Sequence, residues 1–387
     1  MRQVRSRFGA VMRAAAMPVV LLVGAVACSP SKPAVEAAPV TLGDQAVNPG
    51  PLVHRNEPQP QPQDDLTSTR WPPARVGSGH ARVSCEREDA DDAPRRLDSL
   101  EFFSLVDAMT ACQDTGLVRL EYSGRVDAGF TALIERVSAM AERMDLPARI
   151  LDLDSAGGHV EEAVKAGDAL AAARWTLRVR EDAVCHSACV LVLAAADMRD
   201  VEGKVGVHRL MRDRSSASSR AELNEELREV NALVREYLER HGVALAVADL
   251  MMTVPNRRLR ILSAEELDTF GLQGRNAAQD DLERVVARRE CGEGFVRRRD
   301  EFQRRFEATC DVDGGRWEDA VRCGIALRSA YGFPDRRCPD ATPLADAERV
   351  LDLAAARAAR ELALAEEARE ADAADAPSRE GRGSATP

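Results

Sequence analysis

Three short motifs between residues 150 and 209 contain the residue types that acyl-transfer chemistry uses. The strand-like stretch ILDLDSAGGHV contains a diglycine that ends at Gly158, VCHSACVLVLAAA places Ser187 before an apolar run, and GVHR contains His208. Acyl transfer needs a nucleophile, a base that takes its proton, and N–H donors for the developing oxyanion. We predict Ser187 as the nucleophile, His208 as the base, and the backbone N–H groups of Gly158 and Ala188 as the oxyanion donors.

Each motif offers a physical reason for its role. A glycine after a strand lets a substrate carbonyl approach the backbone, because glycine has no side chain. The apolar run after Ser187 predicts a buried helix whose N-terminal dipole favours negative charge at the hydroxyl. Taken singly, the same features fit a helix cap, a turn and a half-buried strand histidine. Their order and spacing together favour a nucleophile site.

The elements that must position these residues follow from periodicity. Strand-like and helical patterns alternate between residues 83 and 285, which predicts an α/β domain. LVRLEYSG and ARILDLDS alternate as strands, whereas AGFTALIERVSAMAERM and HVEEAVKAGDALAAA have helical spacing. The proposed nucleophile and base therefore belong to a layered domain of strands and helices.

This succession of motifs resembles the proteolytic subunit of the Clp protease and, more broadly, the Clp/crotonase superfamily. DSAGG stands at the family's strand-ending diglycine, CHSAC at its serine turn, GVHRL at its histidine and LRILSAEELDTFGL at a later family segment. The resemblance covers roughly residues 116–275. It implies a core of repeated ββα units in a spiral, a Ser187–His208 peptidase site and a Gly158 N–H in the oxyanion hole.

The sequence departs from that family at the acidic member of the triad, because Leu259 occupies the matching position. Asn256 is the nearest polar candidate for a third member. A Ser-Lys dyad, as in some membrane-associated peptidases of the superfamily, would need a lysine further on, and none follows Lys204. Two interpretations stay open: an ATP-independent serine peptidase or hydrolase acting on peptides or proteins, and an inactive Clp-like scaffold or peptide-binding envelope protein.

The N-terminus has the composition of a signal peptide. Four arginines precede the apolar stretch MPVVLLVGAVAC, and the small residues before Cys28 resemble a bacterial lipobox. We therefore expect processing within residues 1–28, a lipid-modified Cys28 and attachment to the outer or cytoplasmic membrane. The alternative is an ordinary secretory signal that is cleaved nearby. Both place the protein in the cell envelope or periplasm.

Cysteine usage agrees with an oxidising compartment. Eight cysteines remain beyond Cys28, an even number, and we expect disulfides among Cys85, Cys112, Cys185, Cys189, Cys291, Cys310, Cys323 and Cys338. Cys85 is expected to pair with Cys112, and the last four with one another in any of three ways. A bridge between Cys185 and Cys189 requires that Cys185 precede the helix, since a continuous helix disfavours that spacing. No zinc-binding CxxC pair is present, and we expect no metal or other cofactor.

Composition divides the rest of the chain. Residues 29–82 read as a Pro/Gln-rich linker, 286–340 as a cysteine-rich region, and 341–387 as an Ala/Glu/Arg-rich helix with a disordered tail. The net charge of −11 argues against a nucleic-acid partner. An amphipathic helix is expected within 219–243. The family resemblance implies that this helix contacts other copies in a homo-oligomer. The alternative is that it packs on its own domain.

Overall fold

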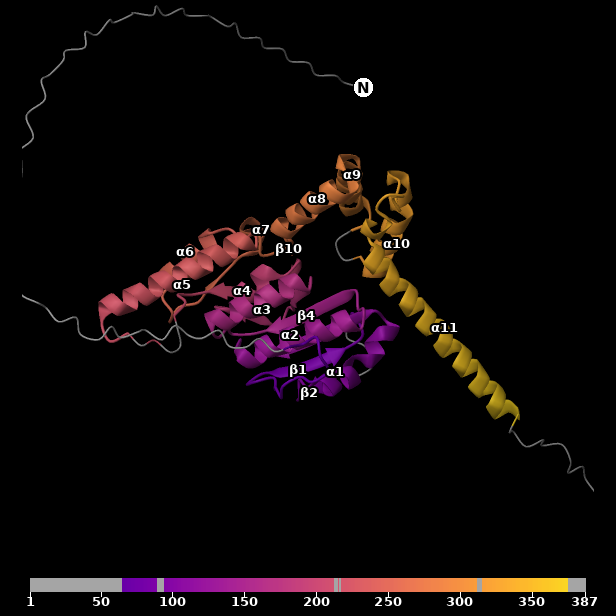
Figure 1. Ribbon diagram of the computed structural model, residues 1–387, viewed down its shortest axis with the longest axis horizontal. Helices are drawn as coiled ribbons and strands as arrows, with labels where there is room; N and C mark the ends of the chain where they lie inside the picture. The colour runs from indigo at the N-terminus through magenta and orange to yellow at the C-terminus, as the bar shows by residue number, and fades with distance from the viewer. Residues whose placement is uncertain (1–64, 89–93, 212–214, 216, 312–314, 375–387) are drawn as a thin grey trace, which may run out of the picture. The chain divides into compact units, whose positions relative to one another are not determined.

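The protein is described by a computed structural model that covers residues 65–88, 94–211, 215, 217–311 and 315–374. The predicted signal peptide, Cys28, most of the linker and the last residues of the tail lie outside the described residues. Two sheets and their helices form a mixed α/β domain, and more helices follow in the chain (Figure 1). The predicted α/β class is confirmed.

The larger sheet has seven strands in the order β10-β7-β5-β4-β3-β1-β2. Its centre is parallel, as expected where helices connect successive strands, and consists of β3 (Leu117–Ser123), β4 (Ala148–Asp154), β5 (Thr176–Val179) and β7 (Met198–Val201). Antiparallel strands complete both edges: β1 (His80–Ser84) and β2 (Arg95–Leu97) on one side and β10 (Gly274–Arg275) on the other.

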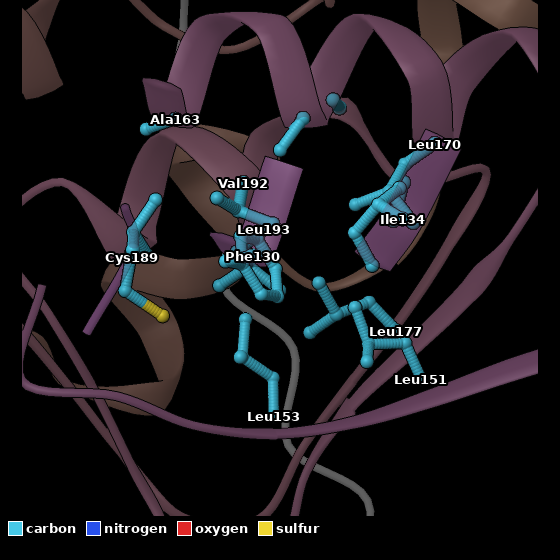
Figure 2. Close-up of a cluster of buried hydrophobic side chains, with 14 of the residues drawn as sticks. Phe130, Ile134, Leu151, Leu153, Ala163, Leu170, Leu177, Cys189, Val192 and Leu193 are labelled. Carbon is cyan, nitrogen blue, oxygen red and sulfur yellow. The ribbon is translucent and has the colours of Figure 1, made fainter. Parts of the chain in front are cut away.

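Three helices line one face of this sheet, namely α2 (Ala128–Arg143), α3 (Val160–Ala172) and α4 (Cys189–Ala195). Figure 2 shows Phe130, Ile134, Leu170, Val192 and Leu193 from the helices around Leu151, Leu153 and Leu177 from the strands. Alternate strand residues point to one face, so β4 and β5 each give their leucines to this core. The fully buried α4 is apolar on all sides, as its sequence predicted.

The opposite face of the sheet is charged rather than apolar. Arg178 Nε lies 2.6 Å from Asp152 Oδ1, and Arg180 Nε lies 3.1 Å from Asp152 Oδ2. A cavity of about 850 Å³ opens on this face, lined in part by Asp152, Asp154 and Arg180. Buried charges persist in a fold when they are paired, which these contacts provide.

A second, three-stranded sheet carries the segments singled out in the sequence. It consists of β6 (Val184–His186), β8 (Lys204–Val207) and β9 (Arg260–Ile261), with β6 parallel and β9 antiparallel to β8. An isolated bridge between Ser155 and Cys185 joins this sheet to the end of β4. The diglycine and the serine turn, 29 residues apart in sequence, are thereby brought together.

The remaining helices are α1 (Phe102–Met109), α5 (Arg220–Arg240), α6 (Ala246–Thr253), α7 (Ala264–Phe270), α8 (Ala277–Cys291), α9 (Glu293–Thr309), α10 (Trp317–Arg328) and α11 (Ala345–Ala374). The predicted boundary at 285/286 falls inside α8. A second small core around Phe295, Phe302 and Phe333 supports the cysteine-rich region. Among the described residues, no helix combines the length and apolar character that crossing a membrane requires.

The domain begins earlier in the chain than the predicted linker boundary at 82. Trp71 and Val76 are 7% and 5% exposed, and β1 starts at His80. The Trp71 ring packs edge-on against Phe102 at 5.3 Å between centroids. Residues 65–79, before β1, show no periodicity in sequence because single side chains, rather than a regular face, attach them to the core.

All eight described cysteines form disulfides, with the pairs Cys85–Cys112, Cys185–Cys189, Cys291–Cys338 and Cys310–Cys323. The first pair links the end of β1 to the segment after α1. The last two belong to the helical region from α8 onward, where the apolar core is small. Of the three pairings that the sequence allowed for the last four cysteines, the structure selects one.

Candidate functional site

Ser187 occupies the turn between β6 and α4. Its backbone φ is +58°, a left-handed conformation that is uncommon for residues with a side chain, and it is 7% exposed. Its N–H donates to the Gly206 carbonyl at 2.9 Å, and its own carbonyl accepts from the Val190 N–H at 3.1 Å. The residue that caps α4 is Ala188, and no side chain caps this helix. The hydroxyl of Ser187 is therefore not used as a helix cap, and the strained backbone favours a functional role.

The diglycine packs directly against this turn. At Gly157, whose φ is +102°, a side-chain Cβ would lie 2.7 Å from the His186 carbonyl oxygen and 2.8 Å from Ser187 Cβ. Gly158 instead lies against the backbone of Val126, with which it forms an isolated bridge. The sequence analysis singled out Gly158, whereas in the structure Gly157 is the glycine that contacts Ser187. The diglycine motif in the sequence pointed to both residues.

The two backbone N–H groups predicted as oxyanion donors make no hydrogen bond within the described residues. The Gly157 N–H donates to Ser155 Oγ at 3.1 Å. Within the described residues, the N–H groups of Gly158 and Ala188 donate to no protein acceptor. Ala188 is fully buried and Gly158 is partly exposed. Because backbone N–H groups without a partner are rare in protein interiors, these two are suited to receive a ligand oxygen.

His208 follows the last residue of β8. The parallel register of β6 and β8 pairs His186 with Gly206, and the Ser187 N–H bonds to Gly206, two residues before His208. The Nδ1 atom of His208 lies 3.1 Å from the Arg209 carbonyl oxygen. If Nδ1 carries the proton and donates it there, Nε2 is left with the lone pair that a base needs. Within the described structure, the His208 imidazole and the Ser187 hydroxyl form no hydrogen bond with each other.

The carbonyl that faces His208 is itself held in place. The Arg209 N–H donates to the Val254 carbonyl at 2.7 Å, and its Nε donates to the Met252 carbonyl at 2.8 Å. The C-terminal end of α6 therefore fixes the backbone beside the imidazole. Sequence reasoning missed Arg209, because a backbone carbonyl leaves no residue-type signal.

The predicted third member, Asn256, makes its described hydrogen bond with another residue than His208. Asn256 is exposed, and its Nδ2 lies 3.4 Å from Met211 Sδ. Leu259, at the position where the resemblance expected aspartate, is 43% exposed and lies above Gly206. The chain after α6 directs the Asn256 side chain toward Met211.

A second histidine adjoins the serine. Burial lowers the pKa of His186, the nearby His208 lowers it further, and Asp154 opposes the shift. Its Nε2 is buried without a hydrogen-bond partner among the described residues. A neutral imidazole is therefore expected here at neutral pH. In the part of the chain that the structure describes, no cluster of His, Cys, Asp and Glu could hold a metal ion.

Comparison with known proteins gives limited matches. No family model and no curated protein matches the chain. Among solved structures, the chain is similar to a serine-to-alanine mutant of the 1510-N membrane-bound stomatin-specific protease, with 15% identity, 40% of this chain and 75% of that chain covered, and a TM-score of 0.32. A lysine-to-alanine mutant of the same protease in complex with a substrate peptide gives 16% identity, coverage of 40% and 71%, and a TM-score of 0.33. TM-scores this low show only a partial likeness between the structures.

Proposed function

We propose that this protein is an ATP-independent serine peptidase or related acyl hydrolase of the cell envelope, with a spiral core of the Clp/crotonase type. The observation that carries the proposal is the left-handed Ser187 between β6 and α4, packed against Gly157. A serine on a strained strand-to-helix turn is a recurrent way to present a nucleophile. Strain of this kind is retained where the surrounding structure holds it for a function.

In the proposed reaction, Ser187 Oγ attacks the carbonyl carbon of an amide or ester, and His208 Nε2 takes the hydroxyl proton. The N–H groups of Gly158 and Ala188 stabilise the oxyanion. The imidazolium then returns the proton to the leaving group, and water hydrolyses the acyl-enzyme by the same route. The Arg209 carbonyl would orient the ring through Nδ1, the task that an aspartate performs in a triad.

A second candidate function is peptide binding without turnover. It is favoured by Leu259 at the expected acidic position and by the lack of a Ser187–His208 hydrogen bond within the described structure. Hydrogen bonds at catalytic sites are often longer before substrate binds. The two candidates differ in whether Ser187 reacts.

A serine-directed fluorophosphonate probe tests the difference. We expect the wild-type protein to be labelled, Ser187→Ala to abolish labelling, and His208→Ala to slow it by about 100-fold or more. Leu259→Asp is expected to speed labelling by giving the imidazole a carboxylate partner. Ser329→Ala, which changes an exposed serine on a distant helix end, is the matched control. A folded wild type that takes no label but binds peptides would favour the second candidate.

A further inference from the structure

The disulfide nearest the proposed nucleophile encloses it. Cys185 lies in β6 and Cys189 is the first residue of α4, so Ser187 is the middle residue of the bridged segment. Both cysteines are 0% exposed. The other three bridges close loops of 13 to 47 residues' separation, whereas this one spans a separation of 4.

A short loop makes this bridge a weak contributor to global stability. The chain entropy that a disulfide removes from the unfolded state rises with the length of the loop it closes. Of the four described disulfides, the Cys185–Cys189 bridge closes the shortest loop and therefore removes the least conformational entropy from the unfolded chain. Its effect is instead concentrated on the few backbone dihedral angles between its ends, and these include the left-handed Ser187.

The surroundings of Ser187 leave little tolerance for movement. Cys185 is fixed on both sides, through its pairing with Val205 and its bridge to Ser155. The space between Gly157 and the turn is small, since a Cβ on Gly157 would lie 3.1 Å from the Ala188 nitrogen. A shift of the turn would therefore change both the serine and the nearest oxyanion donor.

We infer that the Cys185–Cys189 disulfide is a positioning element that holds Ser187 in its left-handed conformation, so that the site forms fully only after these two thiols are oxidised. The inference rests on the proposed function of Ser187. In the oxidation, the two thiols lose two protons and two electrons to a dithiol–disulfide oxidant, which is reduced to its dithiol. The chain made in a reducing compartment would then carry an incomplete site, and export to an oxidising compartment would complete it.

The test compares the full-length wild type with Cys185→Ala/Cys189→Ala and with Cys185→Val/Cys189→Ala, which refills part of the buried volume. Cys310→Ala/Cys323→Ala, which removes a short bridge in the helical region, is the matched control. Circular dichroism spectra, compared with that of the wild type, first establish which variants are folded. The two readouts are the rate of fluorophosphonate labelling and the hydrogen exchange of peptides that span residues 185–193.

For both variants of the 185/189 pair, we expect labelling to slow by about tenfold or more and exchange in 185–193 to accelerate, since small misplacements of reacting groups have large rate effects. The control should keep both values within about twofold of wild type. Unchanged labelling and unchanged exchange in the folded variants would overturn the inference. If the wild type takes no label, the proposed function fails, and the exchange comparison alone decides whether the disulfide holds the turn.

Discussion

The backbone of Ser187 adopts a conformation that its own side chain disfavours, and its neighbours maintain it. A left-handed non-glycine residue costs of order 1–3 kcal/mol. Three features constrain the backbone of this turn: the hydrogen bond to Gly206, the absence of a side chain at Gly157 and the Cys185–Cys189 bridge. At the scale of single residues, the site is therefore defined by backbone geometry as much as by functional groups.

Asp197 illustrates how burial acts on a single charge. Burial, followed by the nearby Glu283 carboxylate, raises the pKa of Asp197 to about 6 from an ordinary value of 3.8. The folded state therefore holds this proton more tightly than the unfolded state. The stability that results is fully present below the unfolded pKa and is lost as pH rises through about 6.

We predict that Asp197→Asn raises the free energy of unfolding relative to wild type at pH 8 and changes it little at pH 4. The expected gain is about 1 kcal/mol, after allowance for the solvent that screens this half-buried side chain. Urea unfolding at the two pH values measures it. Asp200→Asn, which makes the same change at an exposed neighbour, is the comparison variant. An equal effect of Asp197→Asn at both pH values would contradict the assignment.

Among the elements, α2 shows how one side chain can join a helix to a distant strand. Asp127 caps α2 by accepting from the N–H groups of Gly129 at 3.0 Å and Phe130 at 3.1 Å. Its second oxygen accepts from Ser78 Oγ at 2.9 Å, just before β1. The same carboxylate thus starts the helix and attaches the segment that sequence composition assigned to a linker.

We predict that Asp127→Ala lowers the free energy of unfolding by about 2 kcal/mol, because it removes a helix cap and a contact to the β1 segment. Ser219→Ala is the matched comparison, since Ser219 caps α5 with a single bond to the Glu222 N–H at 3.2 Å. That change should cost about 1 kcal/mol or less. Guanidinium unfolding measures both. If the two losses are equal, the link between Asp127 and Ser78 contributes nothing.

At the scale of the whole molecule, the N-terminal sequence and the disulfides bear on where the protein is located in the cell. The lipobox-like sequence before Cys28 leads us to propose an envelope protein that is held at a membrane by lipid on that cysteine. The disulfides agree with an oxidising compartment, because such bonds are rare in the reducing cytosol. Amphipathic helix α5 buries Val230, Val234, Tyr237 and Leu238, so much of its apolar face packs within its own chain. Homo-oligomer formation through α5 stays a prediction.

We predict that Cys28→Ala moves the protein from the membrane fraction to the soluble envelope fraction, because lipid chains supply the apolar area that anchors such a protein. Fractionation followed by immunoblotting measures the change. Ser31→Ala, three residues further on, should leave the protein at the membrane. A mature N-terminus that maps elsewhere, or unchanged fractionation of Cys28→Ala, would rule out the lipid anchor.

The sequence by itself determined the features that depend on local pattern. The alternation of strands and helices from LVRLEYSG to HVEEAVKAGDALAAA follows from periodicity, which each segment encodes on its own. The order of diglycine, serine and histidine was also visible, and so was an even set of eight cysteines beyond Cys28. These are properties of residue type and spacing.

Tertiary structure decided everything that depends on contacts between distant segments. It selected Gly157 as the glycine against the serine, fixed Arg209 against the end of α6 and directed Asn256 to Met211. It also chose one disulfide pairing among three. Backbone dihedral angles, carbonyl positions and cysteine partners are fixed by packing between strands and helices far apart in sequence. No local pattern specifies them, because the same short segment adopts different geometries in different surroundings.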